Sequence, residues 1–181
     1  LIWELHPDTR VFQDSRLQAY PADHFRRIME ASRSQPAWDA LVAGVDWAVL
    51  SVPRPNELSG AGRFPALDWA TVYWDDACEI LVRRHGAFAS LVDPWEYRVL
   101  RPGFDPFAPL PANVGAADRL VDEVQRNRAE NPRGFAAAAW LCLHGDDEEA
   151  CGAARALAGS RPELRRAVLR IDRARTAPPA D

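Results

Sequence analysis

The sequence predicts an α/β fold: a small mixed β-sheet of about four strands with flanking helices, followed by a bundle of about four helices. Three observations lead to this prediction. A continuous apolar run at 47–52 has the length of a buried strand. Two β-branched and aromatic runs within 69–84 flank a short polar turn. The residues after 112 repeat their apolar positions at helical spacing.

The N-terminal part is expected to begin with a strand at 10–13, followed by two helices. Pro21 suits the first turn of a helix, and the apolar residues after it recur at helical spacing, which predicts a helix over 21–33. Ser34 can cap a second, short helix that ends near Gly44.

Three further strands are expected in the middle of the chain. The run at 47–52 is apolar throughout, which is typical of a central strand covered on both faces. The runs at 69–74 and 78–84 are separated by the turn residues Asp75, Asp76 and Ala77, so they predict a β-hairpin. Together with the first strand, the order is β-α-β-β-β.

The segment after the hairpin is rich in proline and is expected to be irregular. Its large apolar residues Trp95, Tyr97 and Leu100 can fold it back over the sheet. Burial of these side chains would cover one face of the strands.

The chain has 181 residues, enough for one ordinary domain or a small domain with an appendage. A proline-rich stretch at 106–112 is expected to link an α/β domain at 1–105 to a helical domain at 113–176. The tail at 177–181 is expected to be disordered.

The helical domain is expected to contain four helices, at about 116–129, 135–144, 148–158 and 161–175. Ser160 and Glu163 have the spacing of a capping box at the start of the last one. This last helix contains six arginines, and its only acidic residues are Glu163 and Asp172. Such a helix can lie on an anionic membrane surface, or it can present a solvated face.

Small residues in the middle two helices have a recognisable order. Ala138 lies in the first helix, Gly145 marks the turn, Ala150 lies in the second helix, and Pro162 follows twelve residues later. In this order the segment 135–162 resembles one tetratricopeptide repeat, in which small residues let helix pairs pack closely. An alanine-rich helical hairpin of no particular family is the alternative.

Composition and charge restrict the classes of partner. All 22 basic residues are arginine, and the formal net charge is −4. Arginine, alanine and proline are abundant together, which indicates a GC-rich genome rather than a phosphate-binding surface. Neither half of the chain is basic enough for a nucleic-acid partner.

The cysteines are Cys78, Cys142 and Cys151. An odd number without a CxxC motif indicates neither a disulfide framework nor a zinc site. Cys142 and Cys151 can face each other across a helical hairpin, or each can be a buried thiol.

No metal or cofactor is predicted, because no histidine has a partner at ligand spacing and no phosphate-binding glycine motif occurs. The acidic residues Asp75, Asp76 and Glu79 could hold a cation, but a hairpin turn alone favours aspartate.

The best candidate site for a substrate or partner follows the first strand. Asp14 and Arg16 lie in the loop after it, with Gln13 and Tyr20 close by in the sequence. Loops at the carboxyl ends of strands are favoured ligand positions in open α/β sheets. The pair could bind a polar head group, or it could be an internal ion pair that fixes the turn.

Three stretches of the N-terminal half carry a recurring combination of short motifs: HPDTRVFQDSRLQAYPADHF at 6–25, GVDWAVLSV at 44–52 and LDWATVYWDDACEILVRR at 67–84, with Trp38 between the first two. In these motifs, residues 3–84 resemble a soluble region of bacterial multi-spanning membrane proteins that are similar to lipid-dependent, GT-C-like glycosyltransferases. In that family the region follows the last membrane helices and lies outside the cytoplasm.

The resemblance implies a non-catalytic, periplasmic domain that helps to bind a substrate or partner. Its partners would be the membrane-embedded remainder of its own chain and a lipid-linked sugar or a protein. The chain begins at Leu1 and its one methionine is Met29, so we expect a piece of a longer protein that holds the transfer chemistry. The alternatives are a soluble protein-interaction module that uses the helical tail, and a small enzyme with its site at Asp14 and Arg16. The alternative location is the cytoplasm.

Overall fold

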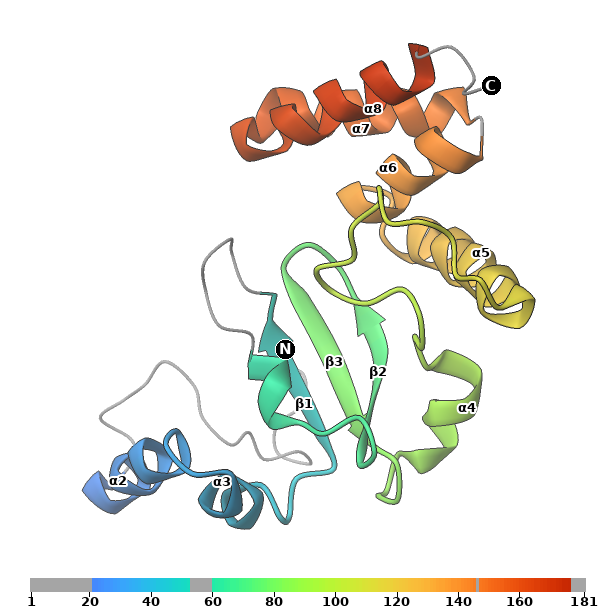
Figure 1. Ribbon diagram of the computed structural model, residues 1–181. Coiled ribbons are helices and arrows are strands. Elements are labelled where there is room, and N and C mark those ends of the chain that lie inside the picture. The colour runs from blue at the N-terminus through green and yellow to red at the C-terminus, as the bar shows by residue number, and fades with distance from the viewer. Residues whose placement is uncertain (1–20, 53–59, 146, 177–181) are drawn as a thin grey trace. The chain divides into compact units, whose positions relative to one another are not determined.

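The computed structural model describes residues 21–52, 60–145 and 147–176 (Figure 1). The predicted strand at 10–13 and the predicted disordered tail at 177–181 lie outside the described residues. The contacts between residues divide the chain into two compact units, Leu1–Val45 and Asp46–Asp181. The proline-rich stretch at 106–112 therefore lies inside the second unit.

The first unit contains two helices among its described residues. The helix predicted over 21–33 is confirmed as α2 (Ala22–Ala31), and the short helix after it is α3 (Gln35–Leu41). Ser34 has an extended backbone, and its side chain accepts a hydrogen bond of 3.5 Å from the backbone N–H of Ala37. This confirms the predicted cap, because a cap oxygen satisfies an N–H group that has no partner within the helix.

The second unit contains the three other predicted strands, β1 (Trp47–Ser51), β2 (Trp69–Trp74) and β3 (Cys78–Arg83). Their order is β1-β3-β2, and both pairs are antiparallel, so the sheet of described strands is antiparallel rather than mixed. β1 and β2 are both antiparallel to β3, so they run parallel to each other. A mixed sheet would require them to pair, but β3 lies between them. The prediction that β1 is a central strand covered on both faces was wrong for the sheet of described strands. β1 lies at an edge of this sheet, and Val49 is 42% exposed.

The segment after β3 packs against the sheet, as predicted. It contains a short 3-10 turn, η3 (Ala89–Leu91), and one helical turn, α4 (Val92–Trp95). The backbone N–H of Tyr97 then donates to the carbonyl of Thr71 in β2 at 2.8 Å. Tyr97 and Leu100 are fully buried, but the prediction was wrong for Trp95, which is 46% exposed.

The helix α5 (Val114–Glu130) shares a hydrophobic core with the sheet and with the start of the next helix. The buried members of this core are Trp74, Tyr97, Leu100, Leu120, Val124, Ala137 and Trp140. Two buried hydrogen bonds hold the layers together: the Trp74 indole donates to the carbonyl of Leu100 at 3.1 Å, and the Asn127 amide donates to the carbonyl of Trp74 at 3.0 Å.

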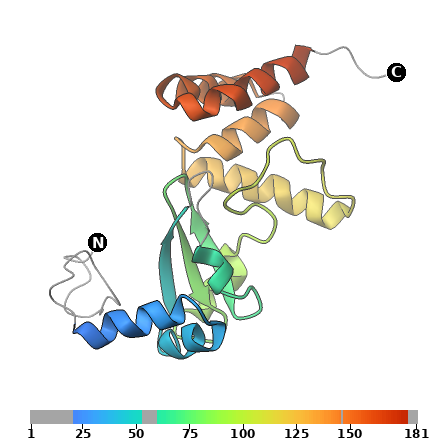
Figure 2. The same ribbon diagram turned by 60° about the vertical axis from the view of Figure 1, so that its left-hand side comes forward.

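The last three helices, α6 (Phe135–His144), α7 (Glu148–Ser160) and α8 (Arg165–Thr176), surround a second core. Figures 1 and 2 both show α7 and α8 side by side, with α6 next to them. All four predicted helices are present, but α5 packs in the first core, so the four do not share a single core. The likeness of α6 and α7 to a tetratricopeptide repeat stays a prediction.

The turn before α8 differs from the sequence-based expectation. A 3-10 turn, η4 (Pro162–Leu164), precedes α8, and no side chain caps it. The predicted capping box is wrong because Ser160 is the last residue of α7, and its hydroxyl donates back to the carbonyl of Leu157 at 3.0 Å.

Candidate functional site

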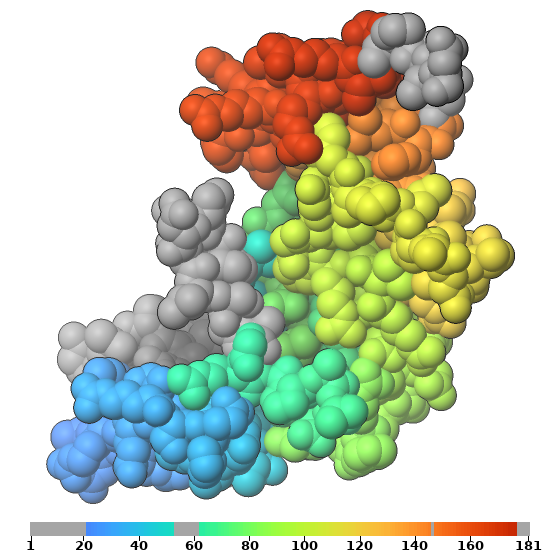
Figure 3. Space-filling view, viewed as in Figure 1, coloured from blue at the N-terminus to red at the C-terminus, as the bar shows by residue number. Residues whose placement is uncertain are grey.

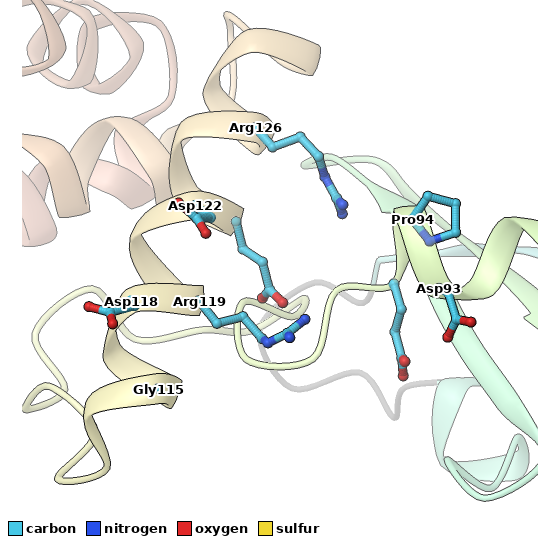
Figure 4. A pocket seen from close by; sticks show the side chains of 9 residues that line it. Asp93, Pro94, Gly115, Asp118, Arg119, Asp122 and Arg126 are labelled. Carbon is cyan, nitrogen blue, oxygen red and sulfur yellow. The ribbon is translucent and has the colours of Figure 1, made fainter.

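A groove of about 370 Å³ lies between α4, with the residues that follow it, and the stretch 115–126 of α5 (Figure 4). The α5 residues that line it are three or four positions apart, so one face of the helix forms one wall. Arg119 and Arg126 extend from this wall toward the α4 side. The groove is lined by Asp93, Pro94, Glu96, Gly115, Asp118, Arg119, Asp122, Glu123 and Arg126.

Glu123 is a buried carboxylate that holds the two walls together. It is 4% exposed and accepts hydrogen bonds from three successive backbone N–H groups, those of Arg98, Val99 and Leu100, at 2.8, 2.9 and 2.7 Å. Burial of a charge is unfavourable unless hydrogen bonds compensate it, and here three donors do so. Glu123 therefore fixes the segment after α4 against α5.

Glu96 is the second buried carboxylate of the groove, and arginines surround it. Arg84 binds both of its oxygens, Arg98 donates to one of them at 2.8 Å, and Arg101 lies 3.9 Å away. Burial opposes the charged form, but the hydrogen bonds from Arg84 and Arg98 outweigh it and hold the pKa of Glu96 below its ordinary value of 4.5. Glu96 is therefore an anion whose charge is compensated by arginines of the protein itself.

Arg126 lines the groove and packs against aromatic side chains. Its guanidinium lies 3.6 Å from the ring centre of Tyr97 and donates to the carbonyl of Trp95 at 2.9 Å. The Tyr97 hydroxyl donates to Glu130 at 2.7 Å. Burial raises the pKa of Tyr97 to about 12, with Arg126 opposing and Glu130 adding to the shift. Tyr97 is thus a neutral hydrogen-bond donor at physiological pH.

The rim of the groove consists of charged side chains that face solvent: Asp93, Asp118, Arg119 and Asp122 are all exposed. Carboxylates and a guanidinium at this spacing can bind charged or hydroxyl-bearing groups of a ligand. The lining holds no serine, threonine, cysteine or histidine, so it offers no nucleophile with a neighbouring imidazole base. The charged rim is suited to holding a polar ligand.

The predicted site residues Gln13, Asp14, Arg16 and Tyr20 lie outside the described residues, so that site stays a prediction. The groove was missed by sequence reasoning. Its one sequence signal is the run of charged residues on a single face of α5. Nothing in the sequence around Glu123 predicts that its side chain is buried.

The alternative cation site at the hairpin turn is used within the protein. Asp75 accepts hydrogen bonds from the backbone of Ala77 and Cys78 and from the Tyr73 hydroxyl, at 2.7, 2.8 and 3.0 Å. Burial opposes the charge of Asp75, but these bonds keep its pKa below the ordinary value of 3.8. Asp75 therefore stabilises the hairpin turn. Of the two interpretations that the sequence offered, a cation site and a turn residue, the structure supports the turn residue.

The other two acidic residues of the predicted cation site, Asp76 and Glu79, also have roles within the protein. Asp76 forms an ion pair with Arg161, and Glu79 is buried in the sheet. Across residues 21–52, 60–145 and 147–176, no group of three or more His, Cys, Asp or Glu side chains is arranged to hold a metal ion.

Cys142 in α6 and Cys151 in α7 form a disulfide. Of the two alternatives left open by the sequence, the structure shows the one in which the two residues face each other across the helical hairpin. Their Cα atoms are 4.7 Å apart, and the buried Ala138 and Ala154 allow the two helices this close approach. The guanidinium of Arg175 lies against both sulfur atoms.

Comparison with protein-family models, with curated proteins and with solved structures finds no match to this chain. Within the described part of the chain, none of the helices combines the length and the apolar character that crossing a bilayer requires.

Proposed function

We propose that this chain is a non-catalytic, extracytoplasmic domain of a bacterial multi-spanning membrane protein that resembles the lipid-dependent glycosyltransferases. It would help to bind a substrate or partner next to the membrane-embedded part of its own chain. The observation that carries the proposal is the disulfide between Cys142 and Cys151.

A structural disulfide favours an oxidising compartment. Glutathione and thioredoxin keep thiols reduced in the cytosol, whereas disulfides persist in the bacterial periplasm and outside the cell. Both cysteines are buried between α6 and α7, where reductants have little access. This supports a location outside the cytoplasm.

The sequence resemblance supports the membrane context. Its last motif, 67–84, contains the hairpin of β2 and β3, and Asp75 holds the turn between them. Its middle motif, 44–52, contains β1, which pairs with β3. These two motifs thus belong to one sheet, as the parts of a single structural element would.

The groove supports a binding role. Its walls are fixed by Glu123, while the rim residues Asp118, Arg119 and Asp122 remain available to solvent. Hydroxyl groups of a sugar or polar groups of a protein partner are suitable ligands for such a rim. The site would therefore bind and position a ligand, and the transfer chemistry would belong to the membrane-embedded part.

The test is the location of this domain in the full-length protein in its own membrane. We would replace Cys78 by serine, introduce a cysteine at the exposed Arg133, and treat spheroplasts with a membrane-impermeant maleimide. Labelling of Arg133→Cys to the same extent before and after lysis is the expected result. Labelling only after lysis would overturn the proposal, and the Cys78→Ser protein without the new cysteine measures the background.

A further inference from the structure

The outward face of α8 carries four arginines around one exposed leucine. Leu169 is 57% exposed and lies one helical turn from Arg165, Arg166 and Arg173. Arg170, the next residue along the chain, is also exposed. We call these five residues the α8 arginine face.

The opposite side of α8 is fixed to the protein. Val168 and Ile171 are buried in the core that α8 shares with α6 and α7. Figure 3 shows side chains of α8, coloured red, at the surface. The orientation of the helix is therefore set, and its arginine face points to solvent.

These arginines are not neutralised by the acids around them. Asp172 pairs with Arg155 of α7 at 2.8 Å, and Glu148 pairs with Arg175. Among the described residues, none of the four arginines of the α8 arginine face forms an ion pair; Arg170 lies 3.8 Å over the ring of Phe107. The face is a positive patch on a chain with a net charge of −4.

We infer that the α8 arginine face binds the surface of an anionic lipid bilayer. One guanidinium group can donate two parallel hydrogen bonds to the oxygens of one phosphate. Four such groups on one helix face can therefore bind several anionic head groups of a flat bilayer surface. Leu169 at their centre would enter the boundary between head groups and acyl chains. A nucleic-acid duplex fits less well, because an exposed leucine gains nothing against a phosphate backbone and the face carries no aromatic residue.

This inference goes beyond the proposed function and does not require it. Binding of α8 to a bilayer depends only on residues of this chain, whereas the proposed function concerns the compartment and the remainder of a longer protein. Failure in a vesicle assay would leave the labelling result in spheroplasts unchanged, and the reverse also holds.

The experiment is cosedimentation of the purified chain with vesicles of phosphatidylcholine and phosphatidylglycerol, compared with pure phosphatidylcholine. We expect binding to the anionic vesicles at low salt and its loss at high salt. Removal of one arginine at an anionic surface should weaken binding about fivefold, so Arg166→Gln with Arg173→Gln should weaken it about 25-fold. Leu169→Asn should weaken it about tenfold at unchanged charge.

The matched control is Arg33→Gln with Arg133→Gln, which removes the same charge from exposed positions elsewhere in the chain. Its binding should stay within about twofold of the wild type. If the melting temperature shows that the first pair disturbs the fold, Arg165→Gln with Arg166→Gln tests the same face. Equal weakening by the control, or no binding of the wild type to anionic vesicles, would overturn the inference, as would binding to a DNA duplex but not to vesicles.

Discussion

The carboxylate of Glu123 accepts a hydrogen bond of 2.7 Å from the backbone N–H of Leu100, 23 residues earlier in the chain. It also accepts bonds from the two preceding N–H groups. One buried side chain thus provides the acceptors for a backbone segment that belongs to neither a helix nor a strand. The groove wall depends on this arrangement.

Replacement of Glu123 by alanine should lower the free energy of unfolding by about 3 kcal/mol, because three N–H groups lose a charged acceptor in a buried position. Urea denaturation measures the change. Asp122→Ala, one position away on the exposed side of α5, should change it by less than about 0.5 kcal/mol. Similar losses in the two variants would contradict the role of Glu123.

Removal of the disulfide by Cys142→Ala with Cys151→Ala should cost about 2–3 kcal/mol, since the bond closes a loop of about ten residues in the unfolded chain. A reductant should destabilise the wild type in urea by a similar amount and leave the double variant unchanged. Cys78→Ala removes the free cysteine and should keep the full response to reductant. A wild type that is insensitive to reductant would show that the bond does not form.

The parts of the fold that the sequence could predict are those that depend on neighbours in the chain. The hairpin of β2 and β3 follows from two β-prone runs and from an aspartate, Asp75, that satisfies its own turn. The cap by Ser34 and the spans of α5 to α8 are likewise decided by local spacing. Such signals stay within a few residues.

The rest depends on contacts between distant residues, which a single sequence does not reveal. The sheet order β1-β3-β2 requires β1 to pair with β3 rather than with the next strand in the chain. The first core unites Trp74 with Trp140, and the groove unites Asp93 with Asp118. Glutamate is also a common surface residue of helices, so nothing at position 123 indicates a buried anchor.

Two glycines allow a test of backbone conformation with opposite expected signs. Gly103 has a φ of +81°, where a Cβ atom is unfavourable, so Gly103→Ala should destabilise the protein by about 1 kcal/mol. Gly152 lies within α7 and has open space around the position of a Cβ atom. Gly152→Ala should therefore stabilise the protein by about 0.5–1 kcal/mol, because alanine favours a helix. Thermal denaturation of both variants decides the matter: two shifts of the same sign would contradict this description of the backbone.

Glu79 in β3 should make stability depend on pH. It is 2% exposed, and its Oε1 atom has no hydrogen-bond partner among the described residues. Burial raises its pKa above the ordinary value of 4.5, although the charge of Arg101 partly opposes this. The folded state therefore holds the proton more tightly than the unfolded state, and stability is lost as the pH rises from 4.5 through the folded-state pKa.

Glu79→Gln removes this charge and should be more stable than the wild type above that window, by on the order of 1 kcal/mol. The difference should shrink as the pH falls through this window and vanish below 4.5, where Glu79 becomes protonated in both states. Unfolding free energies of the two proteins, measured between about pH 4 and pH 8, give this comparison. Glu149→Gln at an exposed position of α7 is the control for loss of a surface charge. A Glu79→Gln protein less stable than the wild type at neutral pH would show instead that the ionised carboxylate contributes favourably to this core.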